Sequence, residues 1–447
     1  MTAFISKPAG GLEGTASVPG DKSISHRALM FGVLGEGETV VSGLLEGEDV
    51  LRTARALLSM GVVVTPPDSK GGVWRIRRGD QKFLRSPKGA IDLGNSGTSA
   101  RLLMGLVAGY PVNVIFTGDE SLSRRPMGRV IKPLALMGVR FETSVADRLP
   151  IRVIGSASLR PIHYRLPIAS AQVKSAILLA GLRANGKTTV IEPQPTRDHT
   201  ERMLASMGAK ITSEMQADGS SVVTVDGLPK LTARSIVVPA DPSSAAFLTV
   251  AALITKDSAI VIPNVLINPH RIGLYDTLRE MGADIRFENL RESGGEPAAD
   301  VHVKSSRLEG IVVPPARVPS MIDEFPILAV AAAFAEGDTV MTDLAELRVK
   351  ESDRLAVMAK GLAAAGVKVT TGETSLTVHG AGGIAPSGGC RIETHLDHRI
   401  VMSFLVLGLA ARAPVVVDDI GAVATSFPGF AALMNSLGAE MAALNPG

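Results

Sequence analysis

The sequence predicts an α/β protein of two similar domains, in which apolar helices lie inside and sheets lie outside. Three observations support this fold class: one helix–strand unit recurs along the 447 residues, its first helix is apolar on nearly every face, and helices alternate with β-branched strands. A chain of this length exceeds what one hydrophobic core usually serves, so two domains of roughly 200 residues are expected.

The recurring unit starts six times, at positions 72 to 82 residues apart. Each start carries a polar residue at its first or second position and leads into about a dozen mostly apolar residues, then a polar break, then a β-branched strand. Asp, Asn or Ser at such a start suits a helix N-cap. The six starts are Asp21, Asn95, Ala169, Asp241, Asp323 and Asp397.

A second helix follows the first in several copies and has a recurrent ending. These endings read "LLSMGV", "LALMGV", "MLASMGA", "LREMGA", "LAAAGV" and "LMNSLGA". The glycine predicts a helix C-cap before the next strand. The first helix has no wide polar face and therefore belongs in an interior, which leaves the sheets on the outside.

Two matching segments predict where the chain passes between the domains. They are "VPGD" at 18–21 and "VPAD" at 238–241. Domain one is expected at 21–240, and domain two at 1–20 plus 241–447, with three units in each.

The composition limits which kinds of partner the protein is expected to bind and in which cellular compartment it is expected to lie. The 46 basic and 44 acidic residues leave a net charge of +2, so no global field draws the chain to nucleic acid or to an anionic membrane. Cys390 is the single cysteine, which excludes an internal disulfide and fits a reducing compartment. Apolar runs reach only about a dozen residues, too few to span a bilayer, and no signal core is present, so a cytoplasmic protein is expected.

The helix starts carry more charge than capping requires. Helix N-termini attract anions through unpaired N–H groups, and burying Lys22 or Arg27 at such a site is costly without an anion. The charged residues at these starts are the cations Lys22, Arg27, Arg125, Lys350, Arg354 and Arg399 and the acids Asp323 and Glu351. Such a set predicts two anionic substrates and carboxyl groups for proton transfer. For any single copy, a simple capped or solvated helix start remains an alternative.

Two points stay open at this level. Asp323 and its neighbour Glu324 can each supply a base or merely suit the helix dipole. His395 and His398 flank Asp397 but lack further clustered ligands, so no metal site is expected.

Taken together, the motifs resemble the 5-enolpyruvylshikimate-3-phosphate synthase (3-phosphoshikimate 1-carboxyvinyltransferase) family. They occur in the family's order over essentially the whole chain: "PGDKSISHR", "LGNSGT", "RRPMGR", "SAQVKSA", "RVKESDRL" and "DHRIVMSF". The resemblance implies two inside-out domains of three βαβαββ units each, closing on the substrates. It also implies transfer of the enolpyruvyl group of phosphoenolpyruvate to the 5-hydroxyl of 3-phosphoshikimate with release of phosphate. The implied enzyme is a monomer of the shikimate pathway to chorismate and aromatic amino acids, and needs no metal or organic cofactor.

The resemblance also implies roles for individual residues. Those expected to bind 3-phosphoshikimate are Lys22, Ser23, Arg27, Ser170, Ala171, Gln172, Arg197, Asp323 and Lys350. Those expected to bind phosphoenolpyruvate are Lys22, Gly97, Arg125, Gln172, Arg354 and Arg399. Asp323 is the expected base, Glu351 the expected proton donor to the methylene carbon, and Lys22 the expected partner of the leaving phosphate.

Some positions depart from the commonest pattern of the family. Thr425 and Glu346 replace a usual lysine and asparagine, and Ala171 replaces a second serine. These departures resemble the family's divergent second branch. Some members of that branch carry Ala where this chain has Gly97, and the methyl group disfavours glyphosate. We therefore expect this chain to be more sensitive to glyphosate than those members.

The sequence leaves two alternative functions. UDP-N-acetylglucosamine enolpyruvyl transferases share the fold but usually carry a cysteine in the loop before "RP", and "GDESLSRRP" has none. A non-catalytic module that binds anions or RNA ends is the alternative from another class. The near-zero net charge and 4% aromatic residues argue against RNA.

Overall fold

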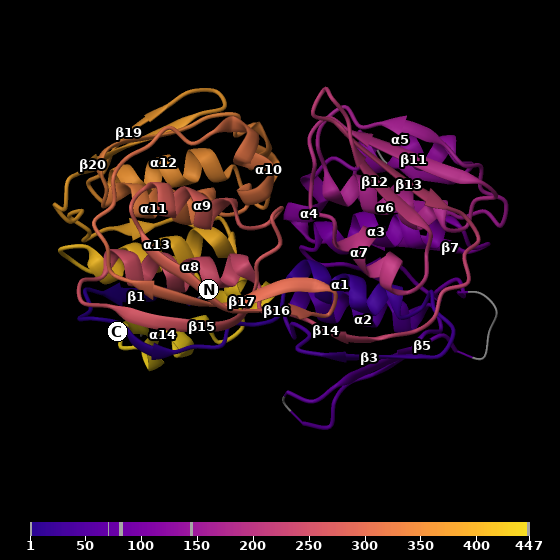
Figure 1. Cartoon of the computed structure of the whole chain (residues 1–447), viewed down its shortest axis with the longest axis horizontal. Coiled ribbons are helices and arrows are strands. Elements are labelled where there is room, and N and C mark those ends of the chain that lie inside the picture. Colours follow the sequence, from indigo (N-terminus) through magenta and orange to yellow (C-terminus); the bar gives the residue numbers. More distant parts are fainter. Residues whose placement is uncertain (1, 70, 80–83, 144–145, 445–447) are drawn as a thin grey trace. The chain divides into compact units, whose positions relative to one another are not determined.

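The computed structural model describes residues 2–69, 71–79, 84–143 and 146–444 (Figure 1). The chain divides into two compact units. The first unit comprises Gly20–Val238 and Gly294–Glu296, and the second comprises Met1–Pro19, Pro239–Ser293 and Pro297–Gly447. The divisions after Pro19 and Val238 fall inside "VPGD" and "VPAD", whereas nothing in the sequence singled out 294–296.

The described strands of the first unit form three four-stranded sheets, each with one parallel edge strand and otherwise antiparallel pairing. In sheet order they are β14 (Ser235–Val237), β3 (Glu38–Ser42), β5 (Trp74–Arg77) and β4 (Val63–Thr65); β6 (Ile91–Asp92), β7 (Asn113–Thr117), β9 (Ile151–Ile154) and β8 (Arg140–Thr143); and β10 (His163–Arg165), β11 (Lys187–Glu192), β13 (Ser221–Asp226) and β12 (Ile211–Met215). The identical pairing in all three sheets reflects the repeated sequence unit.

The second unit repeats this pattern with one variation. Its described sheets are β16 (Asp284–Ser293), β17 (Glu296–Lys304), β15 (Ala259–Leu266) and β2 (Glu13–Thr15); β21 (Arg391–Ile392), β22 (Val415–Val417), β1 (Phe4–Lys7) and β23 (Glu440–Ala443); and β18 (Glu336–Met341), β20 (Leu376–Ala381) and β19 (Lys368–Thr371). The last sheet has three strands. Its parallel edge is reduced to isolated bridges, from Glu309 to Glu336 and from Val312 to Val340.

The first helix of each repeat lies in a core, as its apolar sequence requires. These helices are α1 (Lys22–Phe31), α3 (Gly97–Ala108) and α6 (Ala171–Gly181) in the first unit, and α8 (Pro242–Ile254), α11 (Phe325–Ala333) and α13 (His398–Ala410) in the second. Nearly every residue of α8, α11 and α13 is buried. The three helices pack on one another with strands outside them (Figure 1). The predicted inside-out α/β fold is therefore confirmed.

The second helices end as the sequence predicts. They are α2 (Glu48–Ser59), α5 (Gly128–Leu136), α7 (His199–Ser206), α9 (Gly273–Glu280), α12 (Arg354–Ala364) and α14 (Phe430–Ser436). The glycines that follow them, Gly61, Gly138, Gly208, Gly282, Gly366 and Gly438, have φ between +83° and +108°. An L side chain is strained there, which explains the recurrent glycine.

Shorter helical segments complete the described elements: α4 (Glu120–Arg124), α10 (Val318–Met321), η1 (Pro315–Arg317), η2 (Ala345–Val349) and η3 (Gly421–Thr425). Among the helices of the described ranges, none combines the length and apolar character that a membrane crossing needs.

At five of the six starts a side chain caps the helix as predicted, either at the start residue itself or at the next residue. Side chains of Asp21, Ser96, Ser170, Asp241 and Asp397 accept a hydrogen bond from a backbone N–H in the first turn. The fifth start is different. Glu324 precedes α11 without a side-chain cap, because the backbone after α10 is already helical at Ile322 and Glu324. Asp323 is therefore not the N-cap residue, and its carboxylate contacts Lys350 and Arg354.

Candidate active site

In the first unit, the start of α1 presents the expected cation Lys22. Asp21 caps the helix, and Lys22 is its first residue, with Ser23 next. The Lys22 ammonium donates a hydrogen bond to Asp49, which lies in the first turn of α2 and is almost fully buried. Lys22 itself keeps a fifth of its side chain exposed. Asp49 had no recognisable signal in the sequence, since only the packing of α1 on α2 brings it to Lys22.

Arg27 lies on the same helix one turn further and is 2% exposed. Its guanidinium donates to Thr200 Oγ1 and Ser175 Oγ at 2.8 Å each and to the Ser23 carbonyl at 3.0 Å. Burial is the main cause that lowers the pKa of Arg27 to about 10; the charges of Glu201 and Asp21 oppose this shift, and that of half-buried Arg197 adds to it. None of the bonded partners is a carboxylate. An anion bound near Arg27 and Arg197 would further favour the charged guanidinium.

A second group of candidate site residues lies at the start of α3. Gln172, on α6, donates from Nε2 to Thr98 Oγ1 at 3.0 Å and accepts from Arg101 Nη1 at 2.8 Å. A Cβ added to Gly97 would lie 2.7 Å from Arg101 Nη1 and 3.1 Å from Arg125 Nη1. Gly97, Gln172 and two guanidinium groups are thus neighbours, although they lie on separate elements. Arg101 is a residue that the sequence analysis did not assign to the site.

Arg125 follows α4 and is mostly buried. Its guanidinium donates to the Asn95 side chain and, at 3.2 Å, to Ser121 Oγ. Asn95 immediately precedes the cap of α3, so the Asn95 contact fixes Arg125 beside the helix start. The adjacent Arg124 instead pairs with Glu120 on an exposed face.

The third helix start of this unit carries the short side chains with hydrogen-bond donors that the sequence predicts. Ser170 caps α6, and Ala171 is the first helical residue. Both are partly exposed. Because Ser170 Oγ accepts from Val173 N at 3.4 Å, its hydroxyl hydrogen can still be donated to a ligand.

In the second unit, Asp323 lies between two cations. Its carboxylate accepts from Lys350 Nζ at 3.2 Å and from Arg354 Nη1 at 3.4 Å. The side chains of Asp323 and Lys350 are 14% and 28% exposed, whereas that of Arg354 is 1% exposed. Asp323 and Lys350 can therefore meet a ligand directly.

Arg354 is the centre of a buried charge network. It donates to Asp397 at 2.8 Å from Nε and to Glu351 at 2.5 Å from Nη2. Burial opposes its charge, but Asp397, Glu351 and Asp323 together raise the pKa of Arg354. Burial likewise opposes the charge of Asp397, yet Arg354 lowers the pKa of that carboxyl. The network thus fixes a permanent cation next to both candidate proton-transfer groups.

Arg399 lies in the first turn of α13, and its Nη1 donates to the Asp323 carbonyl at 2.9 Å and to Glu324 Oε1 at 3.2 Å. Glu324 is 2% exposed, far less than Asp323. The structure therefore gives different surroundings to two acids that the residue pattern alone left equivalent. Asp323 can reach a ligand, whereas Glu324 is enclosed.

The histidines do not gather other metal-binding groups at the start of α13, where His395 is exposed and His398 is buried. In the described part of the chain, the side chains of Asp198, His199 and Glu296 come within 4.8 Å of one another through potential ligand atoms. Arg202 already donates to Asp198 at 2.8 Å and lies 3.6 Å from Glu296. Since a guanidinium neutralises these acids, we assign no metal to them.

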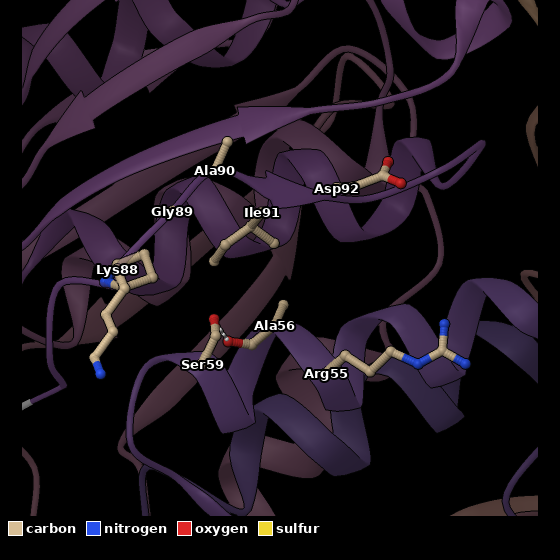
Figure 2. A pocket seen from close by; sticks show the side chains of 9 residues that line it. Arg55, Ala56, Ser59, Lys88, Gly89, Ala90, Ile91 and Asp92 are labelled. Carbon is tan, nitrogen blue, oxygen red and sulfur yellow. Dashed lines mark hydrogen bonds between the residues drawn. The ribbon is translucent and has the colours of Figure 1, made fainter.

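One surface pocket has a volume of about 430 Å³ and is lined by other residues (Figure 2). It is lined by α2, including Arg55 and Ser59, and by the segment 87–92. It includes none of the predicted site residues. Its charged lining residues, Arg55, Lys88 and Asp92, are not among the charged residues predicted at the helix starts.

Comparisons with known proteins identify the family of the chain. The family model described as EPSP synthase (3-phosphoshikimate 1-carboxyvinyltransferase) matches residues 6–434. The 3-phosphoshikimate 1-carboxyvinyltransferase of Paramagnetospirillum magneticum is 58% identical over 441 residues, which cover 99% of this chain and 98% of that protein. The protein of the same name from Parvibaculum lavamentivorans is 56% identical over 439 residues, covering 98% and 97%.

Solved structures give the same result. EPSP synthase from Acinetobacter baumannii superposes with a TM-score of 0.87 at 46% identity, covering 100% of both chains. The enolpyruvyl transferase NikO from Streptomyces tendae has a TM-score of 0.76 at 16% identity, covering 100% of this chain and 99% of the other. At that identity the second likeness concerns the fold alone.

Proposed function

The chain belongs to the EPSP synthase (3-phosphoshikimate 1-carboxyvinyltransferase) family, and we propose from this membership how its residues perform the reaction. The enzyme transfers the enolpyruvyl group of phosphoenolpyruvate to the 5-hydroxyl of 3-phosphoshikimate and releases phosphate. The observation that carries the assignment of roles is the network in which Arg354 contacts both Asp323 and Glu351.

The first half-reaction is an addition. Asp323 removes the proton of the 5-hydroxyl, whose oxygen forms a bond to C2 of phosphoenolpyruvate, while Glu351 gives a proton to C3. Arg354 and Arg399 bind the carboxylate of phosphoenolpyruvate. Fixed charges of this kind stabilise negative charge at little reorganisation cost.

The second half-reaction is an elimination. Glu351, a carboxylate after the addition, takes a proton back from C3, the double bond between C2 and C3 forms again, and the bond from C2 to the phosphate oxygen breaks. The proton that Asp323 took from the hydroxyl is then available to the released phosphate. Lys22 binds the departing phosphate, held in place by its contact with Asp49. Gly97, Arg125 and Gln172 complete the phosphoenolpyruvate site, and their mutual contacts through Arg101 support this grouping.

The remaining residues bind 3-phosphoshikimate. We assign its phosphate to the helix starts of the first unit and its hydroxyl side to Asp323 and Lys350. The residues assigned to the first-unit part of this site are Lys22, Ser23, Arg27, Ser170, Ala171, Gln172 and Arg197. The burial of Arg27 among neutral hydrogen-bond partners supports the presence of an anion there. We further propose two domains, at 21–240 and at 1–20 plus 241–447, in a cytoplasmic monomer that needs no cofactor.

The activity is tested by phosphate release. Wild-type protein should release phosphate from phosphoenolpyruvate only when 3-phosphoshikimate is present. UDP-N-acetylglucosamine should not replace that acceptor, and product analysis should find the 5-enolpyruvyl ether. Release with the nucleotide sugar, or tight RNA binding without release, would favour one of the other two functions instead.

Gly97→Ala is expected to weaken glyphosate binding by about tenfold, with a smaller loss for phosphoenolpyruvate, because overpacking typically costs about 1–3 kcal/mol. The added Cβ displaces the guanidinium groups of Arg101 and Arg125. Inhibition constants and KM for phosphoenolpyruvate measure the effect. Gly89→Ala is the matched control, since a Cβ there meets no atom within 4 Å. Equal glyphosate binding by the Gly97→Ala variant and wild type would contradict the assignment.

A further inference from the structure

We propose that Glu324 is a positioning residue, which holds the Arg399 guanidinium in the orientation that binds the phosphoenolpyruvate carboxylate. This inference rests on the proposed role of Arg399. Glu324 is buried, and its Oε1 accepts hydrogen bonds from Arg399 Nη1 at 3.2 Å and from Ser243 Oγ. Arg399 is further fixed by the Asp323 carbonyl at 2.9 Å. One Nη group of Arg399 is thus occupied by protein oxygens.

Ser243, which donates a hydrogen bond to the Glu324 carboxylate, is itself fixed by Arg271. Arg271, 3% exposed, donates from Nη2 to Ser243 Oγ at 3.0 Å and to Asp241 at 3.1 Å. Because Ser243 accepts from Arg271, its own hydroxyl hydrogen is directed to Glu324. The chain from Arg271 through Ser243 to Glu324 therefore sets the position of the oxygen that Arg399 contacts.

The consequence for binding is preorganisation. A free arginine side chain loses rotamer freedom when it binds a ligand, and a group ordered beforehand avoids most of that cost. The Glu324 carboxylate supplies both a fixed acceptor and a compensating charge for Arg399. Glu324 is enclosed by these partners, so it acts through Arg399 and does not touch substrate.

The experiment compares Glu324→Gln, Glu324→Ala and Ser243→Ala with wild type. Steady-state kinetics give kcat and KM for each substrate. Calorimetry measures phosphoenolpyruvate binding in the presence of an acceptor analogue that lacks the reacting 5-hydroxyl. Glu336→Gln, an exposed change on β18, is the matched control. Thermal unfolding of every variant reports folding.

We expect Glu324→Ala to raise KM and Kd for phosphoenolpyruvate by about tenfold or more, since a charge-assisted hydrogen bond to Arg399 is lost. Glu324→Gln, which keeps an acceptor, should show a smaller rise of about threefold, as should Ser243→Ala. The value of kcat and the KM for 3-phosphoshikimate should stay within about twofold, as for a loss of uniform binding. When Arg399 is already replaced by Ala, Glu324→Gln should cause no further change in KM or Kd for phosphoenolpyruvate.

Other outcomes overturn the proposal in distinguishable ways. An equally large fall in kcat for both Glu324 variants, with unchanged phosphoenolpyruvate binding, would make Glu324 a base. A lower melting temperature with unchanged KM and Kd would make its role structural. If Arg399→Ala itself leaves phosphoenolpyruvate binding unchanged, the proposed site is wrong and this inference fails with it.

Discussion

Asp323→Asn and Glu351→Gln should each lower kcat by about 10²- to 10⁴-fold, because each removes one partner in proton transfer. Both replacements are isosteric and keep an oxygen for the cations Lys350 and Arg354. KM for either substrate should therefore change much less than kcat. Rapid-quench or steady-state measurement of phosphate release gives the turnover of each variant.

The controls for these two variants are Asp68→Asn and Glu336→Gln, both at exposed positions. They should retain wild-type turnover. If Asp323→Asn and Glu351→Gln fold normally and still turn over at near the wild-type rate, the assigned base and proton donor are wrong. A loss confined to one variant would leave the other role without support.

Lys174→Met should lower the free energy of unfolding by about 3–5 kcal/mol, because it leaves two buried carboxylates without their cation. Lys174, on α6, is 1% exposed and contacts Glu192 at 2.8 Å and Glu201 at 2.7 Å. Burial opposes the ammonium charge, yet the two acids raise the pKa of Lys174. Denaturant unfolding measures the loss.

The triple variant Lys174→Met, Glu192→Gln, Glu201→Gln tests the cause of that loss. Removing the uncompensated charges should recover a large part of the stability. Lys187→Met, at an exposed position on the neighbouring strand β11, is the single-site control and should change stability by less than about 0.5 kcal/mol. If the triple variant is as unstable as Lys174→Met, lost packing and not unpaired charge is responsible.

The repeated architecture could be predicted because local features recur in it. The glycines after the second helices were recognisable from short endings such as "LREMGA", since the αL conformation depends on the local backbone. The apolar first helices were likewise recognisable as core elements. The cap at Asp323 was wrong because α10 runs almost directly into α11, a continuity that the polar start did not indicate.

The candidate site was predictable to the extent that its residues lie at helix starts. Lys22, Arg354 and Arg399 each occupy a first turn, so their sequence context was informative. Residues that hold them were not predictable in the same way. Asp49 is separated from Lys22 by 27 residues and reaches it only through the packing of α1 on α2.

The sequence by itself determined the fold class, the family and the positions of most charged helix starts, because these depend on periodicity, capping and local motifs. Only the tertiary structure showed how differently Asp323 and Glu324 are placed. The two acids are adjacent in sequence, but one contacts Lys350 and Arg354 and the other is enclosed by Ser243 and Arg399. Burial and contacts with distant residues fix the role of an ionisable group, and neither can be read from its immediate neighbours.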